Sequence, residues 1–211
     1  MPRRVAFITL LADRLCLDLV NSANWIDGQV ADEAFASVDD VVAWASRALP
    51  MSAGGLDDWK AALSADPQAA EQLPARLRAC RDTIRRLCLA GIDPGASPAG
   101  LQPDLDALFA LNAGAPVRLV AGEAGFRCEP AGGAPDGWLL GLVARSATEL
   151  LLGPDRSALR LCPGHRCGWL FLDRSRSGLR RWCQMETCGN RAKARAHHRR
   201  AQGPQDRSVR E

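Results

Sequence analysis

The chain has 211 residues, of which 47% are hydrophobic and 24% charged, so it suits one ordinary globular domain with a small appendage. This apolar content excludes a chain that is disordered throughout, and no uncharged apolar run is long enough to span a membrane. The N-terminal segment lacks a small-residue cleavage site, so we expect no signal peptide, no membrane partner and a cytoplasmic protein.

Charge is distributed unevenly along the chain. The formal net charge is +3, but residues 155–211 hold 14 Arg and Lys against 5 Asp and Glu, whereas residues 1–154 hold 13 basic and 19 acidic side chains. A strongly basic segment joined to an acidic one predicts a polyanionic partner, most often nucleic acid. A solvated charged tail is the alternative.

The first two predicted elements are helices. Residues 9–25 place leucines at helical spacing, although the alternation within this segment also suits a strand. Ser37 is expected to cap a helix that ends near residue 49. Asp39 and Asp40 then lie in its first turn, where the helix dipole favours carboxylates.

The longest predicted helix covers residues 69–90. Its apolar side chains form one stripe with arginines opposite, and Pro74 is placed near its start, where proline is tolerated. Shorter helices are predicted on either side of it, over 56–63 and 105–111.

Beyond the last of these helices the hydrophobic period changes. Residues 117–129 alternate around a Gly-containing turn and predict a β-hairpin, and 138–153 predict an apolar, mostly buried helix. The Gly-Pro-Asp sequence at 153–155 then breaks the chain. We therefore divide the chain into a body, residues 1–154, and a finger, residues 155–211. Because the apolar stripes of the body can pair with one another, we expect the body to fold without the finger.

The eight cysteines fall into two groups. Four are scattered over apolar faces and are expected to fill the core, namely Cys16, Cys80, Cys88 and Cys128. The others form two C-x4-C pairs separated by fifteen residues, namely Cys162, Cys167, Cys183 and Cys188. Two such pairs can reach one ion from opposite sides, so they predict one tetrahedral Zn²⁺ per chain. Four thiolates leave no open position on the ion, which predicts a structural site.

Three alternatives to this site stay open at this point. Disulfides would suit a secreted protein, redox-active pairs usually have C-x-x-C spacing, and His165 could replace one cysteine as a ligand. The glycines that follow Cys167 and Cys188 are expected to form tight turns in which backbone N–H groups point at sulfur.

The segment 159–200 resembles the CGNR zinc finger, which is named after the tetrapeptide found here at 188–191. The resemblance includes both cysteine pairs, the C-G-W-L-F segment at 167–171 and R-W-C at 181–183. Upstream, residues 15–22 resemble the L-x-L-D-F-x-N-T motif of the ABATE domain, with leucine for phenylalanine and serine for threonine. The resemblance implies an ABATE body followed by a treble-clef-like finger. It also implies a bacterial, stress-responsive transcription regulator that binds DNA through the finger.

The residues after Cys188 are rich in helix formers and basic groups, and their only apolar residues are alanines. Such a helix cannot bury a face in its own core, so phosphates are its expected partners. A second basic cluster precedes it. The residues expected to contact nucleic acid are Arg174, Arg176, Arg180, Arg181, Asn190, Arg191, Lys193, Arg195, His198, Arg199 and Arg200. Trp169, Phe171 and Trp182 are expected to form a small core around the zinc.

One candidate ligand pocket lies in the body, at Asp18, Asn21 and Ser22. The equal alternative for these residues is a satisfied polar network at a helix end. The body has no histidine, and the chain shows no nucleophile–base pair or phosphate-binding loop, so we expect no enzyme.

The predicted fold class is α+β, with a helix-rich body, a small β-hairpin and a four-cysteine finger ending in a basic helix. The predicted function is a DNA-binding regulator whose body senses a small-molecule effector or forms a homodimer. An RNA- or ribosome-associated module, and a protein-interaction module with a purely structural zinc, are the alternatives.

Overall fold

The computed structural model describes residues 10, 14–49, 53–93, 95, 98–113, 117–122, 125–131 and 133–201. In chain order its elements are α1 (Leu15–Val20), β1 (Asn24–Ile26), β2 (Gln29–Asp32), α2 (Val38–Ala48), α3 (Ala53–Ala65), α4 (Pro67–Ile92), η2 (Pro98–Leu101), α5 (Gln102–Ala113), β3 (Val117–Gly122), β4 (Gly125–Pro130), α6 (Pro135–Leu152), η3 (Pro154–Ala158), β5 (Leu159–Leu161), β6 (Leu170–Leu172), η4 (Met185–Gly189) and α7 (Asn190–Ala201). No helix among these residues is long and apolar enough to cross a membrane.

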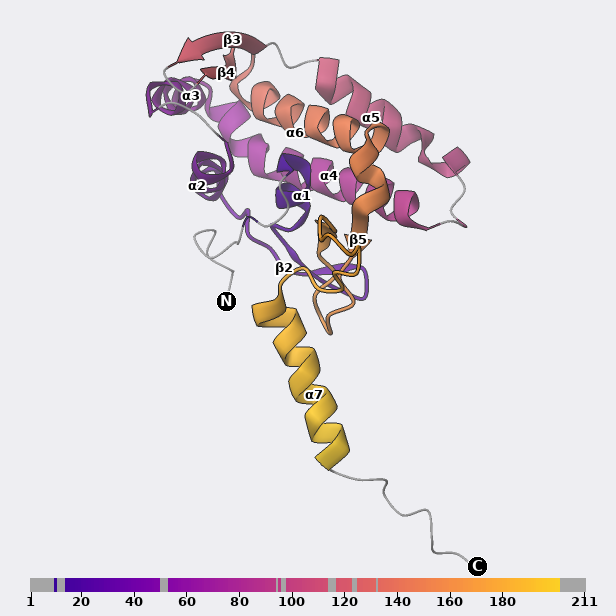
Figure 1. The fold of residues 1–211 in the computed structure, drawn as a ribbon. Coiled ribbons are helices and arrows are strands. Elements are labelled where there is room, and N and C mark those ends of the chain that lie inside the picture. Colours follow the sequence, from indigo (N-terminus) through magenta and orange to yellow (C-terminus); the bar gives the residue numbers. More distant parts are fainter. Residues whose placement is uncertain are drawn as a thin grey trace, which may run out of the picture.

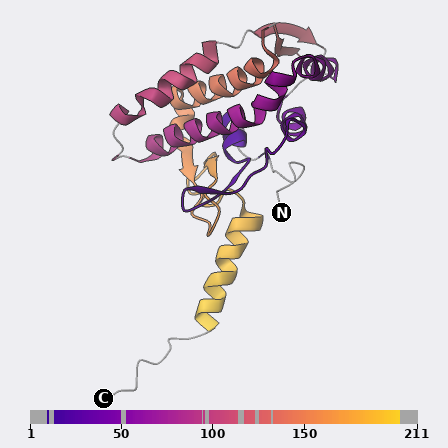
Figure 2. The same ribbon diagram turned by 180° about the vertical axis from the view of Figure 1, so that it is seen from behind.

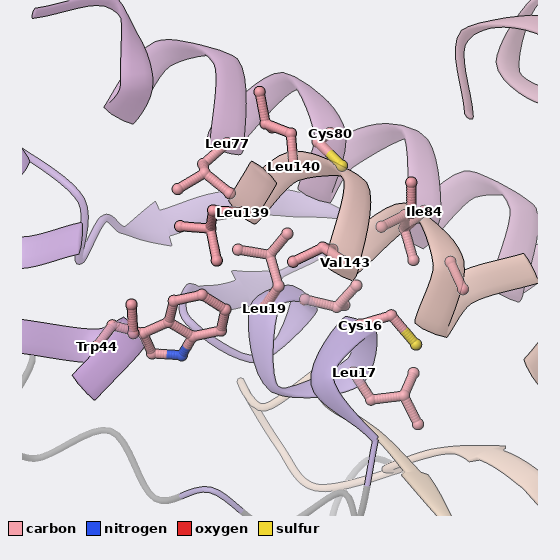
Figure 3. Packing of buried hydrophobic residues seen from close by; sticks show 14 of the residues in the cluster. Cys16, Leu17, Leu19, Trp44, Leu77, Cys80, Ile84, Leu139, Leu140 and Val143 are labelled. Atoms are coloured by element: carbon pink, nitrogen blue, oxygen red, sulfur yellow. The ribbon is translucent and has the colours of Figure 1, made fainter. Parts of the chain in front are cut away.

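The helices of the body surround one apolar core. The helices α4, α5 and α6 lie side by side, and the short α1 packs against both α4 and α6 (Figure 1). Figure 3 shows Leu19 of α1 among Leu77 of α4, Leu139 of α6 and Trp44 of α2, all of them fully buried. A helix of only six residues thus forms the centre of the core, because almost every one of its side chains is buried.

Local signals account for where several helices begin. At the start of α2, the Ser37 hydroxyl accepts a hydrogen bond from the Asp40 N–H at 3.3 Å, and the Asp40 carboxylate accepts one from the Ser37 N–H at 2.9 Å. This capping box confirms the predicted helix start. The predicted start of α4 was too late, because Asp66 caps the helix and Pro67 occupies its first turn. Pro74 therefore lies inside the helix and not near its start.

The structure corrects the prediction of a helix over residues 9–25. Its described part is helical only over α1, and the chain then turns into the two-stranded hairpin β1–β2. Asp27 and Gly28 form the turn, with φ of 51° and 80°. Asp-Gly is a strong signal for such a turn, so the sequence held the information that this hairpin needed.

The three hairpins of the described chain are all antiparallel and two-stranded. In β3–β4, Val117 pairs with Pro130 and Gly122 with Gly125, which confirms the hairpin predicted over 117–129. In β5–β6 of the finger, Leu159 pairs with Leu172 and Leu161 with Leu170. Together with the helices and the four-cysteine cluster, these hairpins confirm the α+β class.

The finger and the body share a core. Leu159, Leu170 and Leu172 of the finger hairpin are buried in the same apolar cluster as the helices of the body. Seen from the opposite side, the finger hairpin lies beneath the helices and α7 projects away from them (Figure 2). The finger is therefore anchored at one end, and its last helix extends from the other.

Candidate metal centre and nucleic-acid interface

Four cysteine sulfurs converge at the junction of the finger hairpin and η4. Cys162 follows β5, Cys167 precedes β6, and Cys183 and Cys188 lie before and within η4. Their Sγ atoms all lie within 4.8 Å of one another, with 3.6 Å between Cys167 and Cys183 and 3.8 Å between Cys183 and Cys188. Sulfurs bound tetrahedrally to Zn²⁺ at about 2.3 Å lie about 3.8 Å apart, so the four thiols fit a zinc ion.

The sulfurs interact electrostatically with one another and with the backbone. The Cys183 N–H donates to Cys162 Sγ at 3.4 Å, as expected for a thiolate site. Hydrogen bonds from the thiols of Cys167 and Cys183 lower the pKa of Cys162 to about 2. The same shared hydrogen bonds raise the pKa of Cys167 to about 12 and also raise the pKa of Cys183. The cluster thus stabilises one thiolate and opposes deprotonation of the other thiols. A bound divalent cation would favour deprotonation of all four.

The remaining cysteines behave as predicted where they are described. Cys16, Cys80 and Cys88 are free and buried in the core. Burial raises the pKa of Cys16 to about 11 and that of Cys80 to about 12, so neither thiol is reactive near neutral pH. The side chain of Cys128 lies outside the described part of the chain. His165 is exposed and does not belong to the sulfur cluster, so the alternative in which it is a ligand is not supported.

Three glycines allow the finger to close around the sulfurs. Gly168 has φ +65° and makes the predicted tight turn, whereas Gly189 has no left-handed backbone. A Cβ at Gly189 would instead meet the Met185 sulfur, so a side chain there would displace the end of the Met185 side chain. Gly164 was not predicted to matter, but a Cβ there would lie 2.8 Å from the sulfur of Cys188.

The aromatic residues around the metal site come from both parts of the chain. Trp169 and Phe171 are buried with the cysteines, and Trp182 packs against them, as predicted. Trp25 of β1 belongs to the same cluster and was not predicted to do so. The Trp169 indole N–H donates to the Ala23 carbonyl at 3.0 Å, which joins the cluster to the body.

Two arginines of α4 support this contact from the body side. The Arg85 guanidinium lies 4.0 Å from the centre of the Trp25 ring and donates to the Gly168 carbonyl at 2.7 Å. Arg81 lies 5.4 Å from the same ring and pairs with Glu33 at 2.9 Å. Both side chains are buried, so the prediction that the α4 arginines all face away from the apolar stripe was wrong.

Asn21, one of the three residues predicted to form a ligand pocket with Asp18 and Ser22, contacts the finger. Asn21 is only 1% exposed, and its amide donates to the Leu170 carbonyl at 2.8 Å and accepts from the Leu170 N–H at 3.0 Å. Asp18 and Ser22 are also buried. The Asn21 amide thus pairs with β6 as a neighbouring strand would, whereas the buried Ser22 hydroxyl has no hydrogen-bond partner within the described residues.

Part of the second basic cluster is engaged inside the finger. Arg180 donates to the carbonyls of Trp182 and Cys183, at 3.1 and 2.5 Å, and lies 4.8 Å from the centre of the Phe171 ring. Arg174 pairs with Asp155 at 3.1 Å. The remaining members of this cluster, Arg176 and Arg181, are exposed.

The other predicted nucleic-acid contacts lie on α7. The amide of Asn190, its first residue, donates to the Glu186 carbonyl at 3.2 Å. The helix contains no acidic residue, and no carboxylate in the described chain pairs with its basic side chains. Those side chains are Arg191, Lys193, Arg195, His197, His198, Arg199 and Arg200. They form a basic helix that projects from the metal site (Figures 1 and 2).

A helical body, a four-thiolate metal site and a basic helix that starts next to the last ligand define a zinc-finger protein. The family model of the CGNR zinc finger matches residues 158–201. The ABATE model, described as "Putative stress-induced transcription regulator", matches residues 13–154. The chain belongs to the ABATE family and carries a CGNR zinc finger. No curated protein matches it.

Proposed function

We propose that this protein is a non-enzymatic transcription regulator that binds duplex DNA through α7, with zinc in a purely structural position. The observation that carries the proposal is the basic helix itself. Seven cationic or imidazole side chains occupy twelve residues without a single carboxylate partner in the described chain. Such a concentration of charge is repulsive on its own and becomes favourable beside phosphates.

The dimensions of α7 suit a groove of DNA. A helix of twelve residues is about 18 Å long, and the major groove of B-DNA, about 12 Å wide, admits one α-helix. Arg191, Arg195 and Arg199 lie along one face, and Lys193 and Arg200 lie on another. One face can therefore approach base edges while the other meets the phosphate backbone.

The proposal is tested by titrating a labelled duplex with the zinc-loaded full-length protein at several salt concentrations. Lys193→Gln, Arg199→Gln and Arg200→Gln should each reduce the slope of log affinity against log salt by about 0.9, if each side chain contacts one phosphate. Arg118→Gln, an exposed charge on β3, is the matched control and should leave the slope unchanged.

Two outcomes would contradict the proposal. If the affinity for the duplex does not depend on salt, the protein-interaction alternative is favoured instead. Tighter binding to RNA of the same sequence would favour the RNA-associated alternative, because the same cations suit either polymer.

A further inference from the structure

A cleft of about 750 Å³ separates the hairpin β1–β2 from the first two turns of α7. One wall comes from the body and the other from the finger, and both views show the hairpin beside the start of α7 (Figures 1 and 2). This volume lies within the usual range for small-molecule sites. The cleft does not include the sulfurs, so the zinc site does not explain it.

The wall formed by the finger is cationic. Arg166, Arg191 and Arg195 line it together with His165. Arg166 has a left-handed backbone, with φ 57°, which is uncommon for a residue other than glycine. No carboxylate in the described residues pairs with any of these three arginines. Three arginines that line one cavity form a site for an anion, because each guanidinium group can donate two parallel hydrogen bonds.

The wall formed by the body has a different character. Ile26, Ala31 and Ala36 give it apolar surface, and Asp32 adds a carboxylate. Glu33 also lines the cleft, but both of its carboxylate oxygens accept hydrogen bonds from Arg81 at 2.9 Å. An anionic polymer that continued along this wall would meet carboxylates, so the cleft does not favour a nucleic-acid backbone.

We infer that this cleft binds a nucleoside phosphate. Its phosphate would lie against Arg166, Arg191 and Arg195, and its base would cover the apolar side chains of the opposite wall. The Asp32 carboxylate would accept a hydrogen bond from a ribose hydroxyl, a role that acidic residues commonly perform in nucleotide sites. A nucleotide matches both walls at once, whereas a bare anion matches only one.

The position of the cleft gives the ligand a regulatory effect, which rests on the proposed function. Arg191 and Arg195 belong both to the cleft and to the basic helix. A bound phosphate would neutralise these two cations and withdraw them from DNA. Nucleotide binding should therefore weaken DNA binding, and DNA should weaken nucleotide binding by the same factor.

The test measures nucleotide binding without nucleic acid present. AMP, GMP, CMP and UMP are each titrated by calorimetry into the zinc-loaded full-length protein at low ionic strength, with adenosine and inorganic phosphate as the two halves of a nucleotide. At least one nucleotide should bind, and more tightly than either half. Arg166→Gln and Arg195→Gln should each weaken it by about tenfold or more, since each removes a charged hydrogen bond. Arg118→Gln should have no effect.

Arg195 is the more informative variant, because it lies seven residues beyond the last zinc ligand, whereas Arg166 adjoins Cys167. Zinc content is measured for both variants. If Arg166→Gln loses zinc, the result is judged from Arg195→Gln alone. The inference is overturned if none of the four nucleotides binds, or if Arg195→Gln binds as tightly as the unchanged protein. Failure of DNA binding in the salt titration would leave the nucleotide result intact, so the two proposals fail separately.

Discussion

The body and the finger are stabilised by different forces. The body buries a large set of apolar side chains between α1, α2, α4 and α6, each contributing about 1.5–3 kcal/mol. The finger has only a small aromatic cluster, and one of its aromatic members, Trp25, belongs to the body. It depends on metal binding, for which structural zinc sites supply about 10–16 kcal/mol. The finger thus combines a metal site with part of the core of the neighbouring body, as segments with a small core of their own commonly do.

The largest expected effect comes from removing two zinc ligands. Cys183→Ser combined with Cys188→Ser should abolish zinc binding and unfold the finger, since the lost metal is worth more than any single side chain in the body. Elemental analysis of protein purified without added metal should give one zinc per chain before the change and none after it. Cys80→Ala, which removes a buried core thiol, should retain the zinc. Unchanged zinc in the double variant would contradict the assignment.

Ending the chain after Pro154 should have the next largest effect. The apolar stripes of the sequence predict a body that folds independently, but the core that the body shares with the finger leads us to expect a different result. The truncation removes Leu159, Leu170 and Leu172, each worth about 1.5–3 kcal/mol, which is a large part of a typical domain stability. It also leaves the buried groups of Asn21 and Arg85 without their finger partners. We therefore expect a dye-binding product that melts without a sharp transition.

The matched control for this truncation ends at Gly189. It removes α7 but keeps the finger hairpin and all four zinc ligands, so cooperative melting should persist. A sharp transition in the shorter chain would show that the body needs nothing from the finger.

A pair of glycines isolates the contact between the two regions. Gly168→Ala and Gly178→Ala both place a side chain on a left-handed backbone, with φ +65° and +64°. This conformation should lower the free energy of unfolding of each variant by about 1–2 kcal/mol. Only at position 168 does the new Cβ meet a neighbour, lying 2.7 Å from Trp25 Cβ. Urea unfolding should show Gly168→Ala to be less stable than Gly178→Ala by about 1–3 kcal/mol. Equal losses would mean that the contact with Trp25 is loose.

The smallest effect concerns the ion pair that joins the two regions at the end of α6. The hydrogen bond from Arg14 to Asp155 holds the pKa of that carboxyl below its usual range. A lowered pKa adds stability near neutral pH that is lost as the pH falls through it. The urea midpoints of the unchanged protein and Asp155→Asn should therefore differ slightly at neutral pH and converge in acid. A difference that grows in acid would contradict this.

The parts of the structure that sequence analysis could predict are those with local signals. The two C-x4-C pairs carry their own spacing, Ser37 and Asp40 form a capping box within four residues, and the alternation over 117–129 is a period that a hairpin requires. Asp27-Gly28 was a local signal of the same kind, and it was overlooked because the leucines before it suggested a continuing helix.

The contacts between body and finger could not be predicted in this way. Asn21 meets Leu170, and Arg85 meets Gly168, across more than eighty residues of sequence. No periodicity relates such positions, and a buried arginine on a helix resembles an exposed one until its partner is known. The aromatic cluster shows the same limit, because Trp169, Phe171 and Trp182 were expected to form it without Trp25.

The π-helical turn η4 has a geometric consequence for everything that follows it. Cys188 lies in this turn and α7 begins two residues later. The metal site therefore fixes the rotational orientation of α7 about its own axis. Each added residue advances that angle by about 100°, since a turn contains 3.6 residues. One alanine inserted between Gly189 and Asn190 would swing every cation of α7 to a new azimuth without changing its charge. The metal site therefore determines the direction in which each basic side chain points around the helix axis, as well as the place where the helix starts.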